Sequence, residues 1–354
     1  MVGAGLDWSM GAKAPLLADW ELALRVGRRV GGPGPRVPPA ERVRINEELN
    51  ELVHLAEDLV AGFTGLQPGR TPARAWVMGR GDWVRRNLLG LQRMLEPLAA
   101  RIVRRRPERS ALARAALGGQ VGALLGYLAR RVLGQFDAFA PPDDEGLLYF
   151  VGPNLIEVEQ RFGVSPRDFR LWVAIHEVTH RVQFAAAPWL RTRLEELIDG
   201  YLAAVPLDAG ALGEHLRRIV EEVLVERRDR SPLALLLTPE QRAVVERAQA
   251  LMSVLEGHAS YVMNEVAAGR VDDLPRLRRA LAARRRTGGP ERALQRAIGL
   301  DRKIRQYDVG ERFVREVARR AGMGGVNLVW REQANLPSGD EVADPARWLA
   351  RVGG

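Results

Sequence analysis

The amino-acid sequence predicts a mainly α-helical protein with at most one small β element. Apolar residues recur at helical spacing along most of the 354-residue chain. A polar residue followed by proline, a common start of a helix, occurs at Ser165 and at Thr238. Only residues 147–151, Leu-Leu-Tyr-Phe-Val between glycines, have the length and composition of a strand. We therefore expect a helical fold in which this strand is the exception.

The N-terminal part of the chain is predicted to form a series of helices after a poorly specified start. A helix within the first 40 residues would end at Gly31-Gly32-Pro33, where the backbone pattern breaks. Thr71-Pro72 has the form of an N-cap and a first-turn proline, which predicts the start of another helix. Helical periodicity predicts further helices over residues 16–30, 40–60, 83–104 and 108–135.

Three glycines at four-residue spacing, Gly118, Gly122 and Gly126, lie in the most apolar stretch of the chain. This stretch, Ala115 to Ala129, is too short to span a bilayer. Small residues along one helical stripe allow another helix to approach closely. The pattern therefore predicts tight helix packing in a buried position.

We expect a single compact domain over residues 41–354, because no internal repeat or long linker divides it. Residues 1–40 are a poorly specified N-terminal segment. A helical layer is assigned to residues 41–140, and the core that carries the functional site to residues 145–335.

Composition and charge exclude several classes of protein. The net charge is +9, but all except two of the 53 basic residues are arginines, an excess over lysine that is typical of codon bias. These arginines are spread among acidic residues, so the charge does not favour nucleic-acid binding. Without cysteine the chain has no disulfide, thiolate ligand or cysteine nucleophile, so any metal must bind histidine and carboxylate. The sequence shows no signal peptide and no membrane span. We expect a cytoplasmic protein.

Residues 176–180 form a His-Glu-x-x-His motif inside a strongly predicted helix with Ser165 as its N-cap. Positions i and i+4 of a helix share a face, so the imidazoles of His176 and His180 can bind one ion. Glu177, between them, can accept the proton of a water molecule. The motif predicts a Zn²⁺ site with Glu177 as the catalytic base.

Catalytic zinc usually has three protein ligands, and we expect the third to be Glu256 or His258. Both lie on a second predicted helix, which begins at the capping box of Thr238. Residues two apart on a helix point to different sides, so both are not expected to bind one ion. Glu256 is favoured, because two histidines and a glutamate are an established catalytic zinc set. His54 and His215 are the other histidine candidates.

The residues around Glu256 have further predicted roles. Gly257 in mid-helix costs about 1 kcal/mol relative to alanine, which suggests that this helix approaches the metal helix closely. His258 or Tyr261 could face the substrate and stabilise a developing oxyanion, the alternative for both being ordinary helix packing. Ser260, one turn after Glu256, could support the ligand.

Four segments together resemble the actinobacterial and chloroflexi zincin-like metallopeptidase family, which is often labelled coenzyme F420 biosynthesis-associated. These segments are GALLGYLARRVLGQFD (122–137), LYFVGPN (148–154), FRLWVAIHEVTHRVQF (169–184) and LEGHASYVM (255–263). The resemblance extends from about residue 40 to Asp344-Pro345.

The resemblance implies a zincin-like, largely helical enzyme that binds zinc through His176 and His180, with Glu177 between them. It also implies that the Glu-Gly-His segment, Glu256 to His258, supplies the remaining ligand. The chain departs from the gluzincin pattern at one position, because Ser260 stands where those enzymes place an acidic residue.

The expected function is zinc-dependent hydrolysis of a peptide or another amide, and the strand at 147–151 could pair with an extended peptide substrate. One alternative is hydrolysis of a small amide or ester in cofactor metabolism, at the same site. Another is a non-catalytic helical scaffold with a vestigial metal site.

Overall fold

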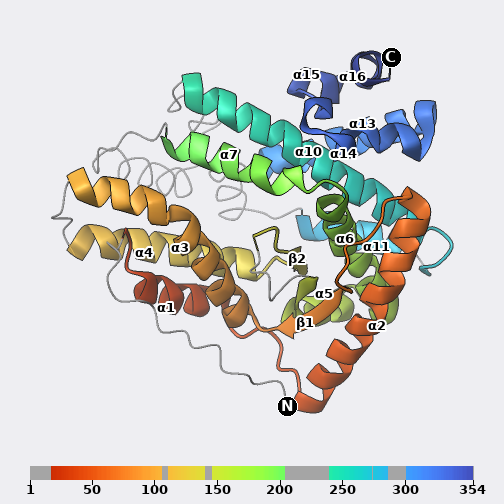
Figure 1. Ribbon diagram of the computed structural model, residues 1–354. Helices are drawn as coiled ribbons and strands as arrows, with labels where there is room; N and C mark the ends of the chain where they lie inside the picture. Colours follow the sequence, from red (N-terminus) through yellow and green to blue (C-terminus); the bar gives the residue numbers. More distant parts are fainter. Residues whose placement is uncertain are drawn as a thin grey trace.

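The computed structural model describes residues 17–105, 111–139, 146–203, 239–272, 274–285 and 300–353 (Figure 1). The helices are α1 (Trp20–Gly31), α2 (Pro39–Thr64), α3 (Arg80–Arg105), α4 (Ala111–Ala129), α5 (Gly152–Phe162), α6 (Pro166–Ala186), α7 (Trp189–Ala203), α10 (Pro239–Ala267), α11 (Leu274–Arg285), α13 (Leu300–Val326), α14 (Leu328–Arg331), α15 (Gly339–Ala343) and α16 (Pro345–Val352), with a 3-10 turn η2 (Gln333–Asn335). The strands are β1 (Arg74–Met78), β2 (Gly134–Phe136) and β3 (Leu147–Val151). The prediction of a mainly α fold is confirmed.

The predicted strand, β3, is the centre of a three-stranded sheet, and the two other strands were not predicted. It pairs with β1 in parallel and with β2 in antiparallel orientation. The helix predicted from Thr71-Pro72 is wrong, because the segment forms β1, and the helix predicted over 108–135 ends at Ala129, before β2. Both errors have one cause. The strands β1 and β2 are held by hydrogen bonds to β3, and the periodicity of a short segment carries no information about such distant partners.

The sheet is the middle layer of the fold, and alternate residues of β3 face opposite helical layers. Leu148 and Phe150 belong to the core that includes α2 and α6. Tyr149 and Val151 belong to the core that includes α1 and α3. Figure 1 shows α1, α3 and α4 on one side of the sheet and α6 with α10 on the other. A strand covered on both faces has the continuous apolar sequence found at residues 147–151.

Helices α1 and α4 pack against each other at glycines, as predicted for the glycine stripe. A Cβ built on Gly118 would lie 2.2 Å from the carbonyl oxygen of Asp19, and one built on Gly122 would lie 2.3 Å from that of Ala23. Only glycine allows this approach. The contact also makes α1, from the poorly specified segment 1–40, part of the helical layer. Within the described ranges, no helix is both long and apolar enough to cross a membrane.

Helix α2 closes the outer edge of β1 with side-chain amides. Asn50 accepts a hydrogen bond from the backbone nitrogen of Ala75 at 2.9 Å and donates one to its oxygen at 3.2 Å. Asn46 accepts a hydrogen bond from the nitrogen of Val77 at 3.1 Å. These contacts satisfy groups that an edge strand would otherwise offer to another chain. β1 is therefore not open to strand addition.

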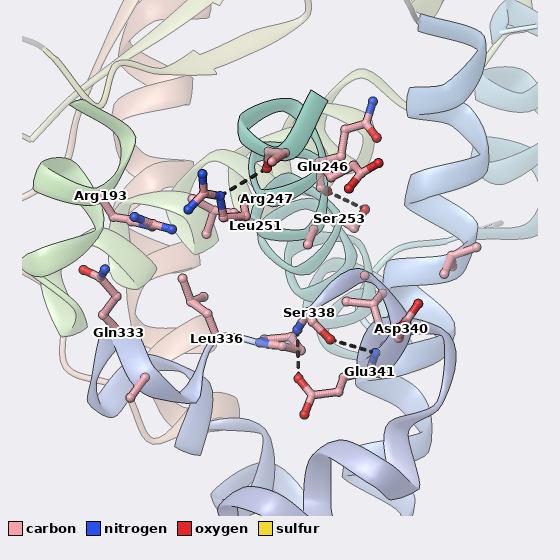
Figure 2. Close-up of a pocket in the computed structure, with 18 of the residues that line it drawn as sticks. Arg193, Glu246, Arg247, Leu251, Ser253, Gln333, Leu336, Ser338, Asp340 and Glu341 are labelled. Carbon is pink, nitrogen blue, oxygen red and sulfur yellow. Dashed lines mark hydrogen bonds between the residues drawn. The ribbon is translucent and has the colours of Figure 1, made fainter. Parts of the chain in front are cut away.

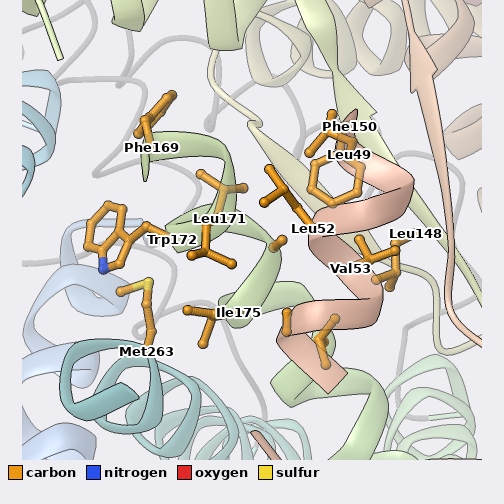
Figure 3. Close-up of a cluster of buried hydrophobic side chains, with 14 of the residues drawn as sticks. Leu49, Leu52, Val53, Leu148, Phe150, Phe169, Leu171, Trp172, Ile175 and Met263 are labelled. Atoms are coloured by element: carbon orange, nitrogen blue, oxygen red, sulfur yellow. The ribbon is translucent and has the colours of Figure 1, made fainter. Parts of the chain in front are cut away.

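Two apolar cores meet at α6 and α10. Figure 3 shows the first, in which Leu49 and Leu52 of α2 lie near Phe150 of β3 and Ile175 of α6. The second joins α7 and α10 to α13 and the C-terminal helices, with Trp330 among its largest buried side chains. The chain segments that carry the two halves of the predicted site are thus held between both cores.

Candidate metal centre

Helix α6 carries both histidines of the motif, and it begins where the sequence predicts. Ser165 accepts a hydrogen bond from the backbone nitrogen of Asp168 at 3.4 Å, which caps the first turn. His176 and His180 lie one turn apart with their rings 4.7 Å apart. Their Nε2 atoms are 3.2 Å from each other, so both rings direct the same nitrogen to one point.

Helix α10 brings Glu256 to the same point from 76 residues further along the chain. Its Oε2 atom lies 3.6 Å from the Nε2 atoms of both His176 and His180. The three potential ligand atoms all lie within 4.8 Å of one another. All three side chains are largely buried, with exposed fractions of 14–22%.

This donor set fits a zinc ion. Ligand atoms at about 2.0–2.1 Å from a tetrahedral zinc lie roughly 3.3 Å from each other, which matches the observed separations. The buried Oε2 of Glu256 has no hydrogen-bond partner among the described residues. An unpartnered buried carboxylate oxygen that faces two imidazole nitrogens is costly unless a cation or a proton lies between them.

The charges of the centre are strongly coupled. Burial alone would lower the pKa of His180, but Glu256 and then Glu177 raise this pKa to about 9. Burial would raise the pKa of Glu256, but the imidazoles of His176 and His180 hold it well below its usual range. The pKa of Glu177 is raised, first by burial and then by the charge of Glu256. The two carboxylates of the centre thus differ, since the pKa of Glu256 is lowered and the pKa of Glu177 is raised.

Glu177 points from α6 to the outer edge of β2. Its Oε2 atom accepts a hydrogen bond of 2.9 Å from the backbone nitrogen of Phe136. A Cβ built on Gly134 would lie 2.8 Å from Oε1, so the glycine makes room for the carboxylate. Leu133 bonds to β3 by accepting from the nitrogen of Val151, so the alternate residues Gly134 and Phe136 direct their backbone groups away from β3.

A model of the family described as zincin-like metallopeptidase matches residues 18–349. The chain belongs to this family. A crystal structure from Chloroflexus aurantiacus, described as that of a candidate hydrolase with a novel fold, is similar at 33% sequence identity with a TM-score of 0.73. The match covers 95% of this chain and 99% of that one. No curated protein matches the chain.

In this zincin-like chain, Gln183 joins the two candidate histidines His180 and His258. Its Oε1 lies 3.0 Å from Nδ1 of His180, and its Nε2 lies 2.8 Å from Nδ1 of His258 and 3.0 Å from the backbone oxygen of Leu255. Gln183 was not predicted as a site residue, although it lies three residues after His180, on the helix face that also carries His176.

His258, which was predicted to face the substrate, lies in a buried position. Its side chain is fully buried, and its ring stacks edgewise on Trp330 with 5.1 Å between centroids. Burial, followed by the charge of His180, lowers the pKa of His258 to about 3, so the ring is neutral. The group of potential ligand atoms therefore contains Glu256 and not His258, whose Nδ1 faces Gln183.

Gly257 and Tyr261 share a face of α10, and the contacts of this face are with α13 and α2. A Cβ on Gly257 would lie 2.2 Å from the backbone carbon of Gly310 in α13, so the predicted close approach exists but involves α13 and not the metal helix. Tyr261 shares the face of Gly257 at i+4 spacing, and its ring lies 6.2 Å from that of Phe63. Burial raises the pKa of Tyr261. The contact with Phe63 is a packing contact, and a role of Tyr261 in oxyanion stabilisation stays a prediction.

His54, His215 and Ser260 were the remaining candidates. His54 lies 3.8 Å from Glu57 on α2, with its side chain half exposed. His215 lies outside the described residues. Ser260 is buried one turn after Glu256, and its supporting role stays a prediction.

A cavity of about 1480 Å³ opens between α7, α10 and the segment from η2 to α15 (Figure 2). Arg193, Arg247, Leu336 and Ser338 are among its lining residues. None of the three potential ligands and neither partner of the Glu177 contact lines it. The cavity is therefore separate from the metal centre.

Proposed function

We propose that the protein is a zinc-dependent hydrolase that cleaves peptide or other amide bonds. The observation that carries the proposal is the convergence of His176, His180 and Glu256 on one point, with Glu177 beside them at a strand edge. The family and the hydrolase-like structural relative support the same class of reaction. Both imidazoles and the carboxylate are ligands that zinc accepts, and a three-residue set leaves a position for a water molecule or substrate.

His176, His180 and Glu256 would hold the ion. Zinc supplies Lewis acidity, which polarises a carbonyl oxygen and lowers the pKa of a water molecule. Glu177 would accept the proton of the attacking water and pass it to the leaving amine.

The contact between Glu177 and Phe136 fixes the base while leaving one carboxylate oxygen for this work. The Phe136 nitrogen holds Oε2, and Oε1 lies over Gly134, which has no side chain to cover it. Because one oxygen of the carboxylate is already anchored, the side chain loses little conformational entropy when it takes up the position needed for proton transfer.

The edge of β2 is the candidate binding surface for an extended substrate. The backbone groups of Gly134 point outward beside Glu177, where a peptide could add as a further strand. The prediction that residues 147–151 would pair with substrate is corrected here, because β3 is paired on both sides. Strand addition at β1 is blocked by Asn46 and Asn50. This arrangement favours a peptide over a compact small molecule.

The test combines metal analysis with a substrate screen. The purified protein should contain close to one zinc per chain and hydrolyse members of a peptide library, and His176→Ala should lose both properties. Cleavage of small amides or esters alone would instead favour the cofactor-metabolism substrate suggested by the F420 label. A chain that binds zinc without hydrolysing any of these compounds would contradict the enzymatic proposal and favour a vestigial metal site.

A further inference from the structure

The three hydrogen bonds of Gln183 determine which atoms carry hydrogen. The backbone oxygen of Leu255 can only accept, so the Gln183 atom that faces it at 3.0 Å is the amide nitrogen. The same nitrogen then donates to Nδ1 of His258, and Oε1 is left to accept from Nδ1–H of His180. In a neutral His180 ring, the lone pair therefore lies on Nε2, the atom that faces Glu256.

We propose that Gln183 is a positioning residue that holds His180 with its Nε2 lone pair directed at the metal position, and that His258 and Leu255 hold Gln183 in that orientation. The effect on zinc binding rests on the proposed function, whereas the hydrogen bonds of Gln183 do not depend on it. Outer partners of this kind fix the tautomer and orientation of a metal-binding histidine.

The role of His258 follows from its surroundings. Its Nδ1 accepts from Gln183, so Nε2 carries the hydrogen, and this buried atom has no hydrogen-bond partner among the described residues. The ring lies edgewise on Trp330, whose backbone oxygen accepts from Nε1 of Trp189. The second core thus fixes His258, His258 fixes Gln183, and Gln183 fixes His180. Burial of the polar imidazole of His258 costs free energy of folding that burial of an apolar side chain would not. The hydrogen bond that His258 accepts from Gln183 is a function that an apolar side chain could not perform.

The first experiment examines His180 in zinc-free protein by ¹H–¹⁵N NMR. The Nδ1–H proton of His180 should exchange slowly with solvent in the wild-type protein and in Gln183→Glu, because both side chains offer an acceptor oxygen. In Gln183→Leu the slow exchange should be lost. A slowly exchanging Nδ1–H in Gln183→Leu would overturn the proposal, whether or not the protein binds zinc.

The second experiment measures zinc affinity by competition with a chelator. Gln183→Leu should weaken zinc binding by roughly 10–100-fold, the usual effect of losing such a partner. His258→Leu should also weaken it, and His258→Asn should recover most of the affinity, since its side-chain oxygen can accept from Gln183. Equal losses in His258→Asn and His258→Leu would overturn the role of His258 as an acceptor.

The matched control is Gln241→Leu, the same substitution at a second buried glutamine, which lies on α10. This residue lies 15 positions before Glu256, about 22 Å along the helix. Gln241→Leu should leave zinc affinity unchanged. If it lowers zinc affinity as much as Gln183→Leu does, the loss in both variants comes from general destabilisation of the protein, and the proposal is overturned. A wild-type protein that binds no zinc would refute the proposed function, and the NMR comparison would then decide the role of Gln183 alone.

Discussion

The backbone nitrogen of Phe136 donates a hydrogen bond of 2.9 Å to the carboxylate of Glu177, and this contact joins the outer edge of β2 to the helix that carries two of the potential ligands. The edge strand and the candidate base are 41 residues apart in the sequence. The relationship places the carboxylate of Glu177, the proposed base, at the edge of the described sheet opposite the edge that α2 covers.

Glu177→Gln tests the role of this carboxylate in proton transfer. A glutamine oxygen can still accept from Phe136, so the fold and the zinc content should not change. The rate of hydrolysis should fall by about 100- to 10,000-fold, the usual contribution of a general base. Turnover and zinc content are measured on the same preparation. Full activity in this variant would remove Glu177 from the mechanism.

Gly134→Ala tests whether the position of Glu177 matters separately from its chemistry. The added Cβ would lie 2.6 Å from Cγ and 2.8 Å from Oε1 of Glu177, so the flexible carboxylate must move. A displacement near 1 Å can lower a rate about 100-fold, and we expect a loss of that order with zinc retained. Gly119→Ala is the control, because a Cβ there meets nothing within 4 Å. Equal activity of both variants would argue against a precisely placed base.

Gly257→Ala tests the contact that positions Glu256. The new Cβ would lie 2.2 Å from the backbone carbon of Gly310, so α10 and α13 must separate. We expect a loss of about 1–3 kcal/mol in the free energy of unfolding, as for other overpacked sites, together with weaker zinc binding. Urea unfolding and chelator competition measure the two effects. Gly90→Ala, where a Cβ meets nothing within 4 Å, should cause neither.

Glu341→Gln tests the acid dependence of the C-terminal helices. Glu341 accepts from Nε of Arg351 at 2.6 Å and from the nitrogen of Ser338 at 2.8 Å, and Arg351 lowers the pKa of Glu341 below 4.5. A lowered folded-state pKa stabilises the protein above the unfolded-state pKa, and this stability is lost as the pH falls through the folded-state value.

Glu341→Gln should therefore destabilise the protein by about 1 kcal/mol at pH 7, allowing for the partial exposure of Arg351, and by less at pH 3. Thermal unfolding at both pH values measures the difference. Asp340→Asn, a neighbouring exposed acid, controls for the change in net charge. A destabilisation that is the same at both pH values would show that the ion pair is not its source.

The sequence predicted well whatever depends on neighbouring residues. The start of α6 at Ser165 and the shared face of His176 and His180 follow from helix geometry alone. β3 was evident from five consecutive residues that suit a buried strand. The glycine stripe of α4 predicted a close helix contact, although the sequence did not name α1 as the partner.

Errors arose where distant residues decide. The segment after Thr71-Pro72 has a helix start signal, but pairing with β3 and side chains from α2 make it a strand. His258 and Tyr261 were offered as substrate-facing residues because their neighbour Glu256 is a plausible ligand. In the structure His258 contacts Gln183 and Tyr261 lies near Phe63 of α2, and the sequence reveals neither contact.

The chain by itself determined the helical class of the fold, the paired imidazoles and the glutamate between them, because each depends on contacts within a few turns of backbone. Only the tertiary structure decided that Glu256 completes the group, that Gln183 backs His180, and that β2 offers its edge to Glu177. Those relationships join atoms 41 to 80 residues apart or select one face of a helix over another. They exist only once two apolar cores have fixed α6 against α10.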